Sequence, residues 1–493
     1  MAKVLNPDIC VIGAGPGGLA VATGAAAYGV KVVLVDKGQP GGQPGGLPGG
    51  LPGDQPAEQP RAGLDCGALL AAALAAAARQ AEMMRTAGRF GIEAAEPEID
   101  FKAVMAHVRD VVASAAPAVS PERLATLGVT VIKGQARFTG RRTLLVGDTE
   151  IRARRYVIAT GTSPIVPDIP GIAEIGCLTE DTVFELGRRP GHLVIIGGSA
   201  AGLELAQTFR RLGSQVTVLE EATVLPGEDP EMAAVVARKL RAEGVTVREG
   251  VKATAVERRG KTSVRVLVET ADGNDDVDGS HLAVAAGRAP DIEGLDLKKA
   301  GVALKGNAID ASAMLRTTNR RIYAVGGVTG APNSAQTATY HAGLVLKALL
   351  FRLPAKDRAV VPGAVRTDPE LARVGLTEAQ ASKRRRKLTV LRWPYAENDR
   401  ARAERRTEGH VKVVAASNGE ILGVTIVGAN ASELIGTWAL ALSKELGLKD
   451  MASSIPPHPT FGEIGKSAAI AYFAGKTRRP LSRGIVRLLQ FFG

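Results

Sequence analysis

The sequence predicts an α/β protein of three domains, in which two domains share one βαβ unit and the third is of the α+β class. Strand, helix and strand are expected at 8–13, 17–28 and 30–35, and again at 193–196, 202–212 and 215–219. Beyond about residue 361, segments 409–415 and 421–427 alternate as in an antiparallel sheet, and helical patterns flank them at 432–446 and 461–474. A chain of 493 residues is long enough for this division.

The first βαβ unit has a glycine-rich turn, Gly13-Ala-Gly15-Pro-Gly-Gly18, between strand and helix. Gly13 permits the tight turn, Gly15 lets a pyrophosphate approach the backbone, and Gly18 lets the helix pack closely on the strand. The start of the helix offers free N–H groups to phosphates. Asp36 ends the second strand, where a carboxylate binds a ribose hydroxyl. This combination predicts a Rossmann-like dinucleotide-binding domain.

The second unit has a less complete match to the same turn, about 180 residues further on. Its glycines are Gly197 and Gly202, and Ser199 takes the middle position. Serine is small enough to leave phosphate access. Glu220 ends the following strand, where a carboxylate favours NAD(H) over NADP(H) by repelling a 2′-phosphate. The alternative is that Glu220 is an ordinary exposed acid.

Together with these turns, four further segments resemble motifs of the pyridine nucleotide-disulfide oxidoreductases, the family of lipoamide dehydrogenase and mercuric reductase. The segments are 159–161 (Ala-Thr-Gly), 286–290 (Ala-Gly-Arg-Ala-Pro), 322–326 (Ile-Tyr-Ala-Val-Gly) and 367–371 (Thr-Asp-Pro-Glu-Leu). The resemblance implies FAD and NAD(H) as cofactors and a homodimer. It implies an FAD domain at 1–155 and 286–358, an NAD domain at 156–285 and a dimerisation domain at 359–493. Beyond the two turns and their acids, it implies cofactor-binding positions at Lys37, Gly41, Gly42, Ala136, Thr160, Gly161, Gly287, Gly326 and Gly327.

A histidine and a glutamate also match the family. The segment from His458 to Glu463 is similar to the family's His-Pro-Thr-x-x-Glu. In the family this histidine handles a proton in the active site of the partner subunit, and the glutamate orients the ring and stabilises its cation. The alternative is a His-Pro turn without chemistry.

The chain departs from the family after Gly38. A Gly/Pro-rich tract at 39–60 is expected to form a mobile loop. The two redox cysteines of the family fall there on Pro44 and Gly49, so disulfide exchange is not expected. Glu204 matches a family glutamate that pairs with a lysine missing here. Unless another cation replaces that lysine, burial should raise the pKa of Glu204.

A second departure concerns Gly327, where the family has an aspartate that holds the ribityl chain of the flavin. Losing that hydrogen bond costs about 1 kcal/mol. We therefore expect FAD to bind more weakly, although the first turn and Asp36 remain.

The three cysteines, Cys10, Cys66 and Cys177, are sparse and show no metal-ligand spacing, so no metal site is expected. We expect a cytoplasmic protein without a signal peptide, and the longest apolar run, 67–78, is too short to span a bilayer. The net charge of +12 is attributed to solvated faces and phosphate-binding sites rather than to nucleic-acid binding, because aromatic residues make up only 4% of the chain.

The function expected from these features is that of an FAD-dependent NADH oxidoreductase. Electrons would pass from flavin directly to a small quinone-like acceptor or a partner protein, with Glu204, His458 and Glu463 as catalytic residues. One alternative is a single-thiol reductase that uses Cys66. Another is a degenerate, non-catalytic binding or scaffold subunit. The apolar segment 485–492, flanked by arginines, is interpreted as an interface helix, a weak membrane contact or a frayed end.

Overall fold

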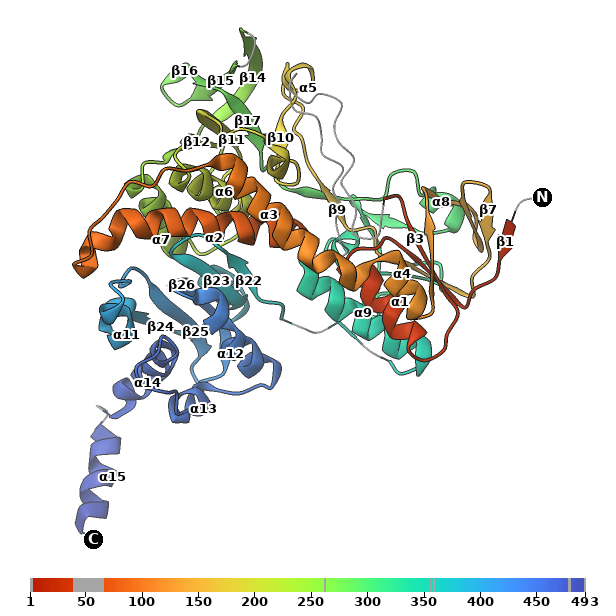
Figure 1. Cartoon of the computed structure of the whole chain (residues 1–493). Helices are drawn as coiled ribbons and strands as arrows, with labels where there is room; N and C mark the ends of the chain where they lie inside the picture. The colour runs from red at the N-terminus through yellow and green to blue at the C-terminus, as the bar shows by residue number, and fades with distance from the viewer. Residues whose placement is uncertain are drawn as a thin grey trace.

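The computed structural model describes residues 3–38, 66–260, 263–354, 356–357, 360–477 and 480–491. The tract expected to be a mobile loop, 39–60, lies outside the described residues, as do Gly41 and Gly42 within it. Three main sheets organise the described chain (Figure 1).

The first sheet is parallel and has the strand order β21-β8-β2-β3-β4. Its strands are β2 (Ile9–Ile12), β3 (Val32–Asp36), β4 (Val129–Lys133), β8 (Arg155–Ile158) and β21 (Ile322–Ala324). Alternate residues face opposite sides, so Ile9 and Val11 pack with helices α1 (Pro16–Ala26) and α9 (Ala335–Leu350). Cys10 and Ile12 pack on the other side, against the small sheet of β1 (Lys3–Leu5), β5 (Ala136–Gly140), β6 (Thr143–Val146) and β7 (Thr149–Ile151).

The second sheet repeats this design, with the parallel order β10-β17-β11-β12-β13. Its strands are β10 (Leu178–Thr179), β11 (His192–Ile196), β12 (Gln215–Glu220), β13 (Thr246–Glu249) and β17 (His281–Val284). Helices α6 (Ala200–Arg211) and α7 (Pro230–Ala242) cover one face, and the antiparallel strands β14 (Lys252–Arg259), β15 (Ser263–Thr270) and β16 (Gly273–Gly279) cover the other. The chain enters and leaves this domain through the paired strands β9 (Thr162–Pro164) and β18 (Arg288–Pro290).

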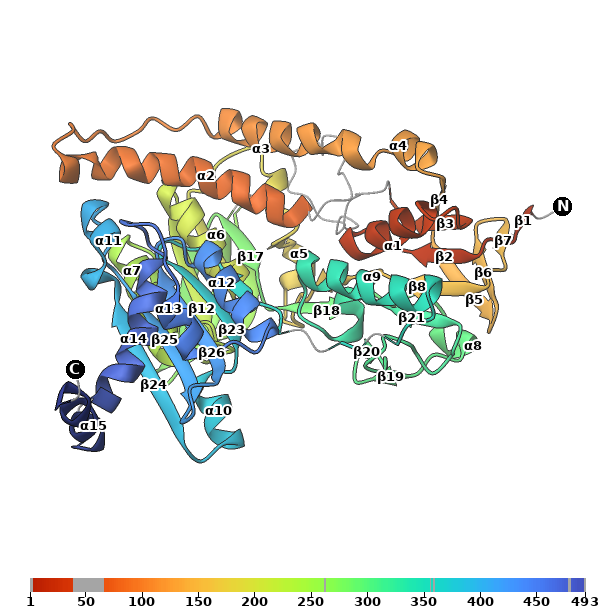
Figure 2. The same cartoon turned by 90° about the horizontal axis from the view of Figure 1, so that it is seen from below.

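Two long helices, α2 (Cys66–Thr86) and α3 (Phe101–Ala115), form an antiparallel pair along one side of the molecule (Figure 2). The alanine-rich sequence of α2 favours a helix. Leu70 and Leu74 from α2 and Met105 from α3 join the core around α6. The short helix α4 (Pro121–Thr126) then leads into β4. This pair therefore bridges the first two domains.

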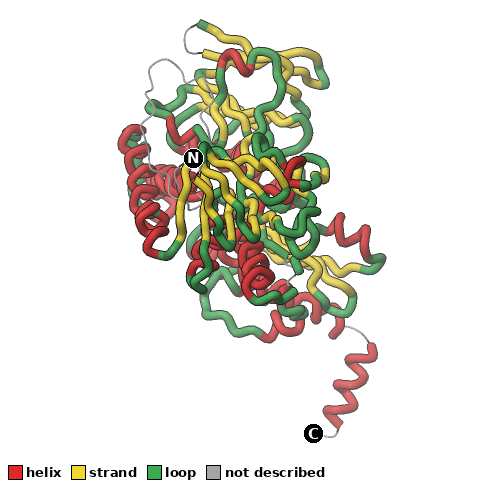
Figure 3. Tube along the Cα trace, turned by 90° about the vertical axis from the view of Figure 1, so that its right-hand side faces the viewer, coloured by secondary structure: helices red, strands yellow, loops and turns green. Residues whose placement is uncertain are grey.

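The third sheet is antiparallel, with the order β22-β23-β26-β25-β24. Its strands are β22 (Gly363–Val365), β23 (Glu370–Gly375), β24 (Leu388–Pro394), β25 (His410–Ala416) and β26 (Ile421–Gly428). Its helices are α10 (Glu378–Arg384), α11 (Asp399–Ala403), α12 (Ala431–Ser443), α13 (Leu448–Ser453) and α14 (Glu463–Thr477). The last helix, α15 (Pro480–Phe491), stands away from the three domains (Figures 1 and 3).

The remaining elements are short. They are the helices α5 (Ile172–Ile175) and α8 (Leu297–Ala300), the strands β19 (Leu304–Lys305) and β20 (Ala308–Ile309), and the 3-10 turns η1 (Ala87–Phe90), η2 (Ala116–Val119), η3 (Val183–Glu185), η4 (Gly326–Thr329) and η5 (Tyr395–Glu397).

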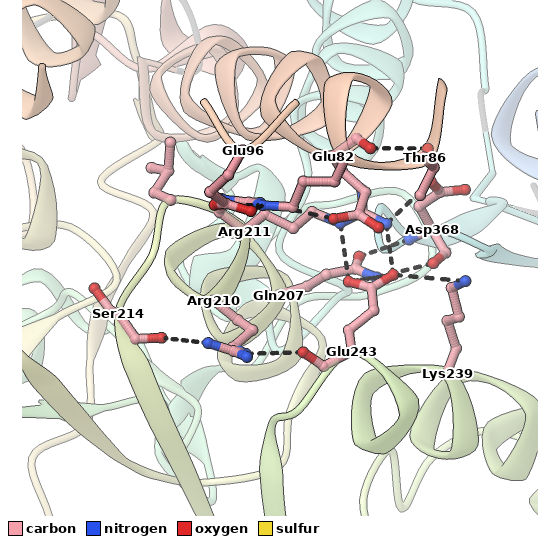
Figure 4. A network of polar contacts seen from close by, with 12 residues as sticks. Glu82, Thr86, Glu96, Gln207, Arg210, Arg211, Ser214, Lys239, Glu243 and Asp368 are labelled. Atoms are coloured by element: carbon pink, nitrogen blue, oxygen red, sulfur yellow. Dashed lines mark hydrogen bonds and ion pairs between the residues drawn. The ribbon is translucent and has the colours of Figure 1, made fainter. Parts of the chain in front are cut away.

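A polar network joins the second domain, the helix pair and the third domain (Figure 4). The buried guanidinium of Arg211 donates hydrogen bonds to Glu243 at 2.7 Å and to Asp368 at 3.1 Å. Gln207 exchanges two hydrogen bonds with the backbone of Asp368, and Arg85 of α2 donates to the carbonyl of Arg211 at 2.7 Å. Because one face of α6 supplies Gln207 and Arg211, this helix is fixed against the turn between β22 and β23 of the third domain.

Candidate functional site

A cavity of about 900 Å³ lies where the three domains meet. Its wall comes from the first glycine turn, the start of α2, one side of α6 and segments of the third domain. Parallel α/β sheets place ligands beyond the carboxyl ends of their strands, and the cavity lies beyond β2, β3, β8 and β21. We therefore take it as the candidate active site.

The first glycine turn has the geometry that its sequence predicts. Gly13 has φ +102°, and a Cβ there would lie 2.4 Å from the carbonyl oxygen of Ala159. A Cβ at Gly18 would lie 1.8 Å from the carbonyl oxygen of Gly13, which explains the third glycine. Around Gly15 nothing lies within 4 Å of the Cβ position, and α1 has no side-chain cap. The helix start therefore keeps open space and N–H groups for a pyrophosphate.

Asp36 braces the same turn from the end of β3. Its carboxylate accepts hydrogen bonds from the N–H groups of Ala14 at 2.7 Å and Gly38 at 2.8 Å. Each oxygen keeps a further lone pair, so a ribose hydroxyl can still bind. The neighbouring Lys37 pairs with Asp291 at 2.8 Å, and both residues line the cavity.

The other side of the cavity contains an unsatisfied polar group. The hydroxyl of Thr160 is buried and has no hydrogen-bond partner within the described structure. Buried polar atoms normally have partners, so this hydroxyl fits a cavity that receives a polar ligand. Gly161 and Gly326 beside it adopt left-handed φ values of +74° each. Together with the first turn, these residues fit the dinucleotide FAD.

Gly327 also lines the cavity, but the space beside it is filled. A Cβ at this position would lie 2.6 Å from the methyl carbon of Thr162 and 3.1 Å from the amide oxygen of Asn333. An aspartate therefore does not fit here without movement of Thr162. Asn333 lines the cavity too, and its side-chain amide offers a hydrogen-bonding group close to the place that the family aspartate would occupy.

The second glycine turn repeats the backbone of the first. Gly197 has φ +112°, and the N–H of Gly198 donates to Glu220 at 2.7 Å. The hydroxyl of Ser199, however, accepts a hydrogen bond from the N–H of Gly202 at 3.3 Å and so caps its own helix. The turn keeps the form that binds a dinucleotide, but its side chain already uses one of the free N–H groups.

Glu204 of α6 lines the cavity and is partly buried. Burial raises the pKa of its carboxyl, which confirms the expected direction. The carboxylate is not without partners, because the backbone N–H of Arg366 donates to it at 2.7 Å and the charge of Arg366 offsets part of the rise. Arg366 is therefore a cation near Glu204 that the sequence did not predict.

An ion cluster in the same cavity wall was not expected from the sequence. Arg288 donates to Glu180 at 2.6 Å, to Asp181 at 3.0 Å and to the hydroxyl of Thr162 at 2.9 Å. Burial raises the pKa of Glu180, and Arg288 offsets part of that rise. The position of Arg288 inside the motif 286–290 was the only signal for this cluster, because its partners come from a distant segment.

The His458 and Glu463 pair is formed. Nδ1 of His458 lies 3.0 Å from Glu463, whose other oxygen accepts from the N–H of Thr460 at 2.9 Å. The hydrogen bond to Glu463 raises the pKa of His458, whose side chain is 66% exposed. Neither residue lines the cavity of its own subunit. This location agrees with a pair that serves the active site of a partner subunit.

The described thiols lie away from the cavity. Cys10 is fully buried in the first sheet, and burial raises the pKa of both Cys10 and Cys177. The side chain of Cys66 lies outside the described residues, but the next two residues, Gly67 and Ala68, line the cavity. Among the residues that the structure describes, no group of His, Cys, Asp and Glu is suited to a metal.

Only some of the residues predicted for the site therefore line the cavity. The predicted residues in its wall are Gly13, Gly15, Asp36, Lys37, Thr160, Gly161, Glu204, Gly326 and Gly327. The predicted residues outside its wall are Gly18, Ala136, Gly197, Ser199, Gly202, Glu220, Gly287, His458 and Glu463. Ala136 is buried in the core beneath the first sheet, so its role toward a cofactor stays a prediction. The cavity residues that were not predicted from the sequence include Asn333, Arg288, Glu180 and Arg366.

Comparison with known proteins agrees with this arrangement. Residues 7–342 match the family described as pyridine nucleotide-disulphide oxidoreductase, and residues 361–469 match its dimerisation domain. Dihydrolipoyl dehydrogenase of Thermus scotoductus is 35% identical over 94% of this chain and 97% of its own length. Mercuric reductase of Lysinibacillus sphaericus is 30% identical over 95% of this chain and 83% of its own length.

A solved structure shares the fold. The HOCl-induced flavoprotein disulfide reductase RclA from Escherichia coli superimposes with a TM-score of 0.80 at 26% identity, over 94% of this chain and 99% of that one. Members of the matched family use FAD and NAD(P)H, and the dimerisation domain indicates a homodimer. With both matches, and with FAD- and NAD-binding domains followed by a dimerisation domain, this chain belongs to the pyridine nucleotide-disulphide oxidoreductase family.

Proposed function

We propose that the protein is an FAD-dependent NADH oxidoreductase that passes electrons to a small acceptor without a redox disulfide. The proposal rests on the composition of the cavity wall. This wall joins the first glycine turn to Glu204 of α6, and none of its described residues is a cysteine. When bound, FAD supplies the chemistry of accepting a hydride and releasing electrons. The residues of the chain bind, orient and handle protons.

Glu220 supports NADH as the electron donor. Its carboxylate stands at the end of β12, beside the second turn, and is fixed by the N–H groups of Gly198 and Ala222. A fixed negative charge at this place accepts hydrogen bonds from a ribose 2′-hydroxyl and repels a 2′-phosphate.

Proton balance assigns a role to the His458 pair. A quinone that takes up two electrons needs two protons to become a quinol, and only one arrives with the hydride of NADH. The second has to come from the protein or the solvent. His458 of one subunit, kept protonated to higher pH by Glu463, is placed on the partner's cavity in this proposal and supplies that proton.

One alternative has specific support. Cys66 begins α2, next to Gly67 and Ala68 in the cavity wall, and the similar protein RclA is described as a disulfide reductase. A thiol at this position could react with a disulfide or another oxidant as a single-thiol reductase. This alternative makes activity depend on Cys66.

An absorption spectrum of the purified protein, followed by anaerobic NADH, tests the proposal. We expect a yellow flavin band that bleaches with NADH and returns when a quinone is added. Cys66→Ser should leave the cycle within about twofold of wild type, with Cys177→Ser as the control for a generic cysteine change. Loss of the cycle in Cys66→Ser alone would favour the single-thiol reductase. A protein that stays colourless even with added FAD would favour the non-catalytic alternative.

A pH profile tests the role of the His458 pair. Because the hydrogen bond to Glu463 raises the pKa of His458, the protonated ring is present below that pKa and is lost as pH rises through it. Glu463→Gln should move the alkaline loss of quinone reduction to lower pH. His458→Ala should lower the rate by about 10²-fold, as expected for loss of a general acid. An unchanged profile in Glu463→Gln would remove His458 from the mechanism.

A further inference from the structure

The last helix, α15 (Pro480–Phe491), exposes large apolar side chains. Ile485, Val486, Leu488 and Leu489 are 51%, 53%, 60% and 64% exposed, and none of them belongs to a core of the three domains. Figures 1 and 3 both show the helix standing clear of the rest of the molecule. Exposed clusters of this kind mark interaction surfaces in folded proteins.

The apolar and charged residues of α15 lie on different faces. Ile485, Leu488 and Leu489 have the spacing i, i+3 and i+4, which places them along one side of the helix. Arg487 falls about 200° around the axis from Ile485, at 100° per residue, and so lies opposite to them. The helix is therefore amphipathic, with an arginine on its polar side.

The charge of this part of the chain has one sign. Residues 464–493 contain six basic residues and no aspartate or glutamate, whereas the whole chain has 50 acidic residues in 493. The basic residues are Lys466, Lys476, Arg478, Arg479, Arg483 and Arg487. A second copy of the helix would bring like charges together, and the match to the dimerisation domain ends at residue 469, before α15 begins. An anionic surface is the partner that complements this charge.

The length of α15 decides how it can meet a lipid bilayer. Its 12 residues extend about 18 Å at 1.5 Å per residue, which is less than the roughly 30 Å of a bilayer core. No helix within the described ranges is both long enough and apolar enough to cross a membrane. An amphipathic helix of this length lies in the plane of the interface instead.

We propose that α15 docks the protein on the surface of an anionic lipid bilayer. Ile485, Leu488 and Leu489 enter the boundary between headgroups and acyl chains, and the positive charge of this part of the chain, including Arg487, is attracted to the anionic headgroups. The inference goes beyond the redox function and stands whatever the acceptor is. Docking would hold the protein at the membrane, where apolar acceptors dissolve.

Co-flotation of the purified, flavin-loaded protein with lipid vesicles tests this inference. Wild type should float with vesicles of phosphatidylcholine and phosphatidylglycerol, stay behind with phosphatidylcholine alone, and be released by high salt. Leu488→Ser/Leu489→Ser should weaken binding roughly 100-fold, from about 1.5 kcal/mol of apolar burial per leucine. Arg487→Gln should weaken it about fivefold, from about 1 kcal/mol per basic residue at the surface. Leu304→Ser and Arg320→Gln, exposed positions in the first domain, are the matched controls and should bind like wild type.

Three results would overturn the proposal. One is wild-type protein that stays behind with phosphatidylglycerol vesicles. Another is a double leucine variant that floats as well as wild type. The third is a double variant that sediments as a monomer where wild type sediments as a dimer, since a second copy of the chain would then cover the helix. If the double variant fails to retain its flavin, Arg487→Gln and the salt dependence of wild type decide the question.

Discussion

The two glycine turns have similar backbones but differ in the residue at their middle position. Gly13 and Gly197 have φ values of +102° and +112°, and in both turns a carboxylate accepts an N–H at 2.7 Å. The space at Gly15 is open, whereas Ser199 occupies the equivalent place and caps α6. The first turn thus keeps its N–H groups for a ligand, and the second uses one for itself. This difference suits a cofactor that stays bound on one side and a substrate that must leave on the other.

The largest effects are expected when a methyl group is added to each turn, which tests whether the two turns bind their nucleotides independently. In Gly13→Ala and Gly197→Ala the new Cβ would lie 2.4 Å and 2.5 Å from a carbonyl oxygen, at a strained φ. We expect Gly13→Ala to lose its flavin absorbance. Gly197→Ala should keep the flavin but lose bleaching by NADH. Gly29→Ala, with φ +73° but nothing within 4 Å, controls for backbone strain alone. Loss of flavin from Gly197→Ala would show that the two sites are not separable.

A smaller effect, on the KM for NADH, is expected from substitution of Glu220 beside the second turn. Glu220→Ala removes a charged acceptor for the ribose, and such hydrogen bonds contribute about 1.5–3 kcal/mol. The KM for NADH should rise about tenfold or more, while the KM for NADPH changes little or falls. Steady-state kinetics with both donors checks this expectation. The exposed neighbour Glu221→Ala is the control and should keep the wild-type ratio. Equal losses with both donors would mean that Glu220 only braces the turn.

The smallest effect, on the affinity for NADH, is expected from substitution of Ser199. Ser199→Gly frees the N–H of Gly202 and makes the second turn like the first. We expect NADH binding to tighten about two- to threefold and the protein to lose only a few tenths of a kcal/mol of stability, the usual cost of such a cap change. Ser120→Gly removes a similar cap from α4, away from the cavity, and should alter stability alone. Weaker NADH binding in Ser199→Gly would mean that the hydroxyl contacts the ligand.

The sequence predicted the parts of the fold that depend on local pattern. The expected helix at 17–28 is α1 (Pro16–Ala26), and the expected strand at 409–415 is β25 (His410–Ala416). The glycine turns followed from the same logic, since positive φ and close backbone approach permit few other residues. The boundaries of the three domains stay predictions at the level of single residues.

The rest of the site could not be predicted because it consists of contacts between distant segments. Glu204 receives its hydrogen bond from the backbone of Arg366, and a backbone N–H leaves no signature in the residue type. Asn333 lies beside Gly327 only because the turn after β21 folds back into the cavity. The resemblance drew attention to Gly327 and Glu204, whereas the structure identified Asn333 and Arg366 beside them.

The contacts between α6 and segment 366–368 have a further consequence for the intact enzyme. Glu204, Gln207 and Arg211 hold this segment, which belongs to the domain that pairs subunits in the family. Under the proposed function, dissociation of the dimer removes the partner's histidine, and any loosening of the third domain would also reach the cavity wall through this segment. Specific activity should fall on dilution more steeply than loss of His458 alone explains, and enzyme concentration becomes a variable that every kinetic measurement on this protein has to hold constant.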